Sequence, residues 1–137
     1  MIFKNLTKNF YISSLIIFVI FLLDRISKIY VINLASKNST SELFSSKFLN
    51  INLIWNEGIA FGLLSFDQSD LYNILTSIIA LIIVIVFFMI VKNNNIKRYP
   101  LLMIFGGAIG NLYDRIFFKA VPDFIDFHVG EFHWFIF

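Results

Sequence analysis

The polar residues that interrupt or closely follow the apolar stretches of this chain are the ones that could do chemistry. They form three groups: Asp24, Arg25 and Lys28; Asn111, Asp114 and Arg115; and Asp123 with Asp126. Ionisable residues in apolar spans are energetically expensive, so each is a candidate functional residue. Asp123 is the strongest candidate for acid–base catalysis, because its apolar neighbours should desolvate its carboxyl group and raise its pKa. Asp126 is expected to be a solvated acid of an interfacial loop.

The first two groups admit two interpretations. Asp24 and Lys28 are four residues apart, so on a helix they share a face in the order that pairs best. They could form an ion pair that neutralises itself while the helix crosses a membrane. A second helix with Asp114 and Arg115 at the same depth favours a polar pocket between the two helices.

The composition indicates whether the elements that must position these residues lie in water or in a membrane. The chain has 137 residues, of which 58% are hydrophobic and 15% are charged, with a mean hydropathy of +0.81. Soluble domains are about 25% charged, so this is a membrane protein. Its length allows three or four spans in a single integral membrane domain, residues 1–137. The net charge of +2 gives no reason to expect nucleic acid as a partner.

Three segments are predicted to span the membrane, at about residues 10–34, 71–91 and 99–118. The first is interpreted as a retained span, because no small-residue cleavage site follows its apolar core. The third contains small residues that let helices approach closely and predict a packing face: Gly106, Gly107, Ala108 and Gly110.

The orientation follows from basic residues, which are enriched on the cytoplasmic side. They precede the first span and fill the turn between the second and third spans: Lys4, Lys8, Lys92, Lys97 and Arg98. Residues 35–70 and the tail after Phe118 should therefore lie outside. Residues 48–55 alternate in part and predict a short strand or hairpin on the membrane surface. Three aromatic residues could lie at headgroup level: Trp55, Phe61 and Phe66.

Other catalytic chemistries find little support. The chain has no cysteine, which excludes disulfides and thiol nucleophiles. His128, Glu131 and His133 match no zinc signature, so no metal and no other cofactor is predicted. The hydroxyl groups, such as those of Ser27 and Ser65, have no base in a recognisable arrangement.

Three sequence segments carry a resemblance. DRISK at 24–28 is similar to a D-x-x-[ST]-K box, and NEGIAF at 56–61 is similar to N-x-G-x-A-F. GGAIGNLYDR at 106–115, followed by VPDF at 121–124, is similar to G-G-A-x-G-N-x-x-D-R…V-x-D-F. Together, in this order and at these places relative to the spans, they resemble the lipoprotein signal peptidases (signal peptidase II), aspartyl proteases of the bacterial inner membrane.

The resemblance implies a fold and a topology. Four transmembrane helices are expected in the family, with both termini cytoplasmic, and three of them in this chain. We therefore predict an all-α membrane protein, a bundle of three transmembrane helices with a small extracytoplasmic β-cradle between the first two. The resemblance also implies a monomer in the inner membrane, with the active site near the outer face.

The resemblance implies proteolysis by two aspartates, which removes the signal peptide before the lipidated cysteine of a diacylglyceryl-modified prolipoprotein. The partners are then prolipoproteins and membrane lipids, and no metal is needed. Asp123 matches one catalytic aspartate. The matched residues that would support it and the substrate are Asp24, Lys28, Asn56, Gly58, Asn111, Asp114 and Arg115.

The second catalytic aspartate belongs to a later F-N-x-A-D box, whose first residue could be Phe137, so that aspartate is expected beyond Phe137. We therefore expect the 137-residue chain to be inactive. Two departures lie nearer to Asp123. Lys119 stands where a glycine is usual, and Pro122 replaces a usual apolar residue.

Two other functions remain open. A small transporter or channel subunit would explain the intramembrane charges as an ion or proton path, but leaves Asp123 and the NEGIAF segment unexplained. An anchor or assembly protein with self-paired charges explains less. Ion flux in liposomes, set against cleavage of a lipidated peptide, distinguishes transport from proteolysis.

Overall fold

The computed structural model describes residues 2–58, 69–93 and 95–136, arranged as three helices and four strands. In chain order the elements are α1 (Ile2–Asn38), β1 (Glu42–Ser45), β2 (Leu49–Asn56), α2 (Ser69–Lys92), α3 (Arg98–Phe118), β3 (Val121–Val129) and β4 (Phe132–Ile136). Phe61 and Phe66, two of the predicted interfacial aromatics, lie outside the described residues.

Helices α2 and α3 match two predicted spans. Over Tyr72–Lys92 and Arg98–Phe118 they are long and apolar enough to cross a membrane. Helix α1 is continuous through Asp24 and Arg25 and, at 37 residues, is about 55 Å long. It is not one of the two helices that meet this criterion within the described ranges, so its crossing stays a prediction.

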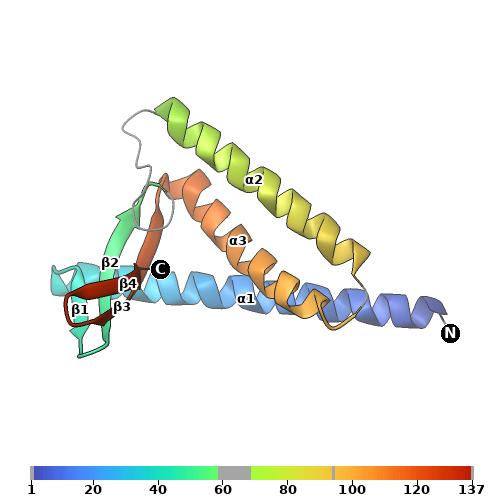
Figure 1. Ribbon diagram of the computed structural model, residues 1–137, viewed down its shortest axis with the longest axis horizontal. Helices are drawn as coiled ribbons and strands as arrows, with labels where there is room; N and C mark the ends of the chain where they lie inside the picture. Colours follow the sequence, from blue (N-terminus) through green and yellow to red (C-terminus); the bar gives the residue numbers. More distant parts are fainter. Residues whose placement is uncertain (1, 59–68, 94, 137) are drawn as a thin grey trace.

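The outer surface of the helices is apolar. Large side chains such as Phe18 on α1 and Ile82 on α2 are more than half exposed. The N-terminal end of α1 and the α2–α3 turn lie at one end of the molecule, and the sheet lies at the other (Figure 1). Contiguous apolar surface of this extent is suited to lipid and not to water.

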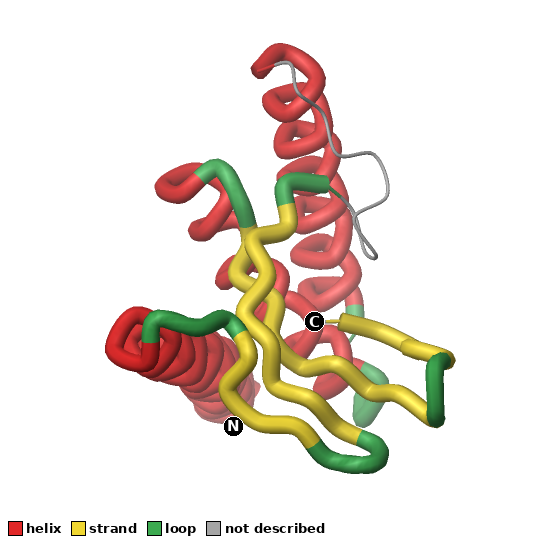
Figure 2. Tube along the Cα trace, turned by 90° about the vertical axis from the view of Figure 1, so that its left-hand side faces the viewer, coloured by secondary structure: helices red, strands yellow, loops and turns green. Residues whose placement is uncertain are grey.

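The β structure is larger than the sequence predicted. Four antiparallel strands form one sheet in the order β1-β2-β3-β4, which lies across the end of the helices (Figure 2). The prediction of three helices with a small β-cradle is confirmed in part, since β1 and β2 lie between α1 and α2. The fold is not all-α, however, because half of the four-stranded sheet follows α3. Two acids and a proline interrupt the alternation of apolar and polar residues in 121–129, so the sequence indicated a loop instead of a strand. Gly130, with φ of +61°, makes the two-residue turn between β3 and β4.

Helix α3 packs closely on α1 through two of the predicted small residues. A Cβ atom on Gly106 would lie 2.9 Å from the Ile20 Cβ, and one on Gly110 would lie 2.3 Å from the Asp24 Oδ2. A Cβ on Gly107 would meet nothing within 4 Å, so Gly107 is not part of the packing face. The contact of α3 with α1 therefore depends on Gly106 and Gly110.

Candidate active site

Asp123 lies near the start of β3, where the chain leaves α3. Helix α3 ends at Lys119 in the left-handed conformation, with φ of 61°, which turns the chain into the sheet. Asp123 is paired with Ile54 of β2, and its side chain is half-buried. The side-chain amide of Asn56, at the end of β2, donates a hydrogen bond of 2.8 Å to the Asp123 Oδ2.

A chain of hydrogen bonds fixes Asn56 itself. The Asn56 Oδ1 accepts a 2.9 Å hydrogen bond from the backbone N–H of Gly58. The buried guanidinium of Arg115 in α3 donates to the carbonyl oxygen of Gly58. The Tyr72 hydroxyl of α2 donates in turn to the Arg115 carbonyl oxygen at 3.2 Å. Residues of α2 and α3 therefore fix the turn at Gly58, and this turn orients Asn56, the hydrogen-bond partner of Asp123.

The electrostatic environment of Asp123 favours a titratable carboxyl group. Burial raises its pKa above the ordinary value. The hydrogen bond from Asn56 and the charges of Lys28 and Arg115 act in the opposite direction but do not cancel the desolvation. The predicted desolvation of Asp123 is confirmed.

Between α1 and α3, four charged side chains form a closed cluster. Asp114 is fully buried, and its two oxygens accept hydrogen bonds of 2.5 and 2.6 Å from Arg25. Lys28 donates to the Asp114 Oδ2 and to Asn111, both at 2.7 Å. Asp24 binds Lys28 at 2.9 Å and Arg25 at 2.7 Å.

Both sequence interpretations of these residues hold in part. The Asp24–Lys28 ion pair forms, and the second helix brings Asp114 into it. No specific role was predicted for Arg25 from the sequence. In the structure its guanidinium bridges the carboxylates of Asp24 and Asp114 and lies 4.9 Å from the centre of the Tyr113 ring. The sequence feature that could have indicated this role is the position of Arg25 directly after Asp24.

Asp126 is not the solvated acid that the sequence predicted. Only 2% of it is exposed, and it lies on β3 between two neighbouring strands. His133 of β4 is 2.9 Å from both carboxylate oxygens, and Asn50 of β2 donates at 3.3 Å. The interfacial segment folds as an inner strand, and this buries the side chain that a loop would have left in water.

His128 and His133 have partners other than a metal. Their rings stack with centroids 5.1 Å apart, and the two ring nitrogens of His128 face the carbonyl oxygens of Ser46 and Gly130. Across the described part of the chain, no three or more His, Asp or Glu side chains are arranged to hold a metal ion.

The comparison with protein families decides what kind of site this is. The family model of signal peptidase (SPase) II matches residues 16–137, which include the α1–α3 cluster and Asp123. The chain belongs to the lipoprotein signal peptidase family. These are aspartic-type endopeptidases of the membrane, so the family predicted from the three sequence boxes is confirmed.

Individual members of the family agree with this assignment. A lipoprotein signal peptidase of Pelagibacter ubique is 52% identical over 95% of this chain and 78% of its own length. One from Aquifex aeolicus is 42% identical over 84% of this chain and 68% of its own length. A solved bacterial membrane enzyme matches with a TM-score of 0.66 at 27% identity, over 90% of this chain and 76% of that chain.

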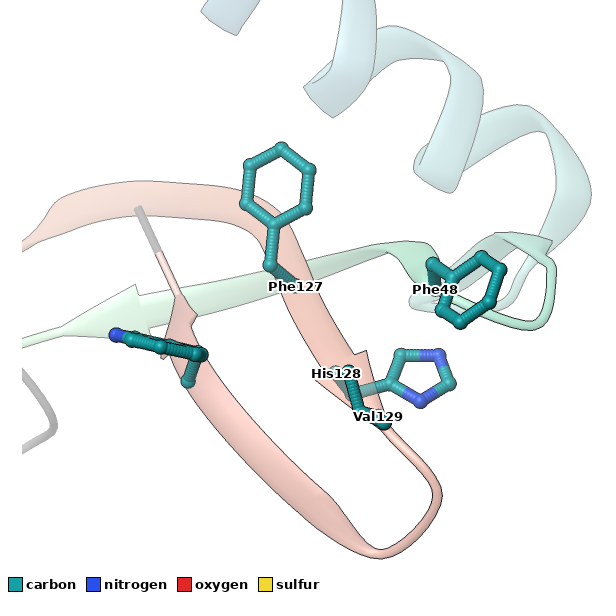
Figure 3. Close-up of a pocket in the computed structure, with 5 residues that line it drawn as sticks. Phe48, Phe127, His128 and Val129 are labelled. Atoms are coloured by element: carbon teal, nitrogen blue, oxygen red, sulfur yellow. The ribbon is translucent and has the colours of Figure 1, made fainter.

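This chain also has an open apolar pocket at the end of the sheet that carries the β1–β2 and β3–β4 turns. Its volume is about 340 Å³. Figure 3 shows the His128 ring beside Phe48 in this pocket, which is lined by Phe48, Phe127, His128, Val129 and Trp134. Asp123 is not among the lining residues, so this pocket is separate from the candidate catalytic group.

Proposed function

We propose that this signal peptidase removes the signal peptide from diacylglyceryl-modified prolipoproteins, cleaving before the lipidated cysteine, with Asp123 as one of two catalytic aspartates. The observation that carries the proposal is the partner of each carboxylate. Asp123 accepts a hydrogen bond from a neutral amide, whereas Asp24, Asp114 and Asp126 each bind a basic side chain.

The environment of Asp123 suits peptide hydrolysis by a pair of carboxyl groups. Like charges close together cannot both ionise easily, so one carboxyl group keeps a proton and acts as the acid while the other activates water. The raised pKa of Asp123 prepares this group for such sharing. The hydrogen bond from Asn56 fixes one of its oxygens and leaves the other to face the substrate.

The second carboxylate of the pair is expected beyond Phe137. Asp114 and Asp126 are poor substitutes, because each is bound to basic side chains within its own cluster.

The other residues of the three boxes act as supports. Arg115 and Gly58 hold Asn56, while Lys28 and Asn111 connect the α1–α3 cluster. We infer that this network orients Asp123 and the backbone of the substrate. The same pairing weakens the case for an ion path, because the charges that suggested transport are engaged with one another.

The proposed topology places three helices across the inner membrane with the N-terminus in the cytoplasm. The Lys and Arg residues of the N-terminus and of the α2–α3 turn lie at one end of the molecule, and the sheet with Asp123 lies at the other (Figure 1). Asp123 would then act near the outer face, where the lipidated cysteine of a prolipoprotein is anchored. We propose that the enzyme works as a monomer.

The decisive experiment replaces the carboxyl group of Asp123 with an amide. Asp123→Asn in the full-length protein should abolish cleavage of a lipidated prolipoprotein while the thermal unfolding in detergent stays close to that of the wild type. Glu131→Gln, an exposed acid in the β3–β4 turn, is the matched control and should cleave normally. Cleavage by the Asp123→Asn variant would refute the catalytic role.

A further inference from the structure

Asp126 is a fully buried carboxylate that the proposed reaction does not use. It is held by side chains of both neighbouring strands: Asn50 on β2 and His133 on β4. The backbone pairing agrees, because Asp126 lies opposite Asn50 on one side and Ile136 on the other. A single carboxylate therefore links the three strands β2, β3 and β4.

A buried charge of this kind requires a compensating partner. Burying an unpaired carboxylate is energetically costly, and removing one member of a buried pair leaves the other without its partner. The His133 ring, with half of its side chain exposed, places its Nδ1 2.9 Å from both Asp126 oxygens. Of the described titratable groups, those placed against His133 are Asp126 and His128.

The backbone ladder of β3 is irregular on both sides of Asp126. The register between β2 and β3 shifts between Ile51 and Ile54, and the register between β3 and β4 shifts between Phe127 and His128. Such irregularities interrupt the ladder and bend the strand. Asp126 lies between these two interruptions, only three residues from Asp123.

We propose that Asp126, together with His133 and Asn50, is a positioning unit that fixes the register of β3 and thereby aims Asp123 at the scissile peptide bond. The inference rests on the proposed catalytic role of Asp123. Asp126 itself does not touch the substrate. Small displacements of a catalytic group by a remote substitution reduce the rate of the chemical step up to about a hundredfold.

The test measures kcat and KM separately for cleavage of a lipidated prolipoprotein by the full-length protein. In Asp126→Asn, kcat should fall about tenfold to a hundredfold, while KM stays within about twofold, because a positioning defect acts on the chemical step and not on substrate binding. His133→Asn changes a half-exposed residue, so it serves as a second variant if Asp126→Asn does not fold, and it should lose kcat in the same way.

The two residues should act as one unit. The double variant Asp126→Asn/His133→Asn should lose no more kcat than the more affected single variant, whereas independent residues would show additive losses. Glu131→Gln, in the same hairpin, should retain the wild-type kcat. Unchanged kcat in the folded single variants, additive losses in the double variant, or a loss confined to KM would each overturn the proposal.

Asp123→Asn, measured in parallel, separates this inference from the proposed function. If Asp123→Asn is inactive and Asp126→Asn cleaves like the wild type, only the positioning role is wrong. If Asp123→Asn cleaves, the proposed catalytic role fails and the positioning role fails with it.

Discussion

The acids of the helical bundle and the acid at the start of β3 differ in the chemistry of their partners. Between α1 and α3, Asp24 and Asp114 bind two cations, so the cluster is neutral as a whole. In the sheet, Asp123 binds the neutral amide of Asn56. The carboxylates of the bundle connect two helices through ion pairs, whereas burial raises the pKa of the Asp123 carboxyl group, which has an amide as its partner. The difference separates the scaffold from the reactive group.

Removing the central acid of the cluster should have the largest effect on stability. Asp114→Asn leaves Arg25 and Lys28 opposite Asp24 alone, so one buried cation loses its compensation. Breaking a buried pair in this way costs about 3–5 kcal/mol. Thermal unfolding in detergent should show this loss, while Glu131→Gln should change stability by less than about 0.5 kcal/mol.

A second substitution tests whether charge balance is the cause. Lys28→Met added to Asp114→Asn restores one cation opposite one carboxylate, and it should recover part of the lost stability. A double variant that is less stable than Asp114→Asn would show that the hydrogen bonds of Lys28, and not the net charge, stabilise the cluster.

The close approach of α3 to α1 is the geometric condition for the cluster. Gly106→Ala would bring a Cβ within 2.9 Å of the Ile20 Cβ and 3.1 Å of the Ile17 carbonyl oxygen, which is backbone and cannot rotate away. Overpacking of this kind costs about 1–3 kcal/mol. Gly107→Ala, one residue along, meets nothing within 4 Å and should be neutral or slightly stabilising. Equal unfolding temperatures for the two variants would contradict the packing role of Gly106.

The pH dependence of stability should distinguish Asp123 from the paired acids. Because burial raises its folded-state pKa above the ordinary 3.8, the folded protein holds this proton more tightly than the unfolded chain does. The resulting stabilisation is fully present below the unfolded pKa and is lost as the pH rises through the folded pKa. Asp123→Asn should remove this contribution, so the difference in unfolding free energy between variant and wild type should grow with pH in the acidic range. A difference that is independent of pH would contradict the raised pKa.

The sequence predicted the two regions unequally, for a physical reason. Spans α2 and α3 and the Asp24–Lys28 pair follow from local patterns, namely apolar length and a spacing of four residues. The strand β3 could not be found in this way, because its register depends on β2, more than 60 residues earlier, and its own acids break the alternation. The burial of Asp126 depends on side chains from two other strands and was therefore predicted wrongly.

Lys119 connects the helical bundle to the sheet. A substitution that relieves its backbone conformation should have the smallest of these effects on the free energy of unfolding. Lys119 ends α3 in the left-handed conformation, with φ of 61°, which is unfavourable for a residue with a Cβ and favourable for glycine. This explains why glycine is the residue that the family resemblance led us to expect at this position, where lysine adopts the left-handed conformation. Lys119→Gly should raise the free energy of unfolding by about 1 kcal/mol. Lys119→Ala removes the same charge but keeps a Cβ, so it should not gain this stability; equal gains in both variants would attribute the effect to charge instead of backbone conformation.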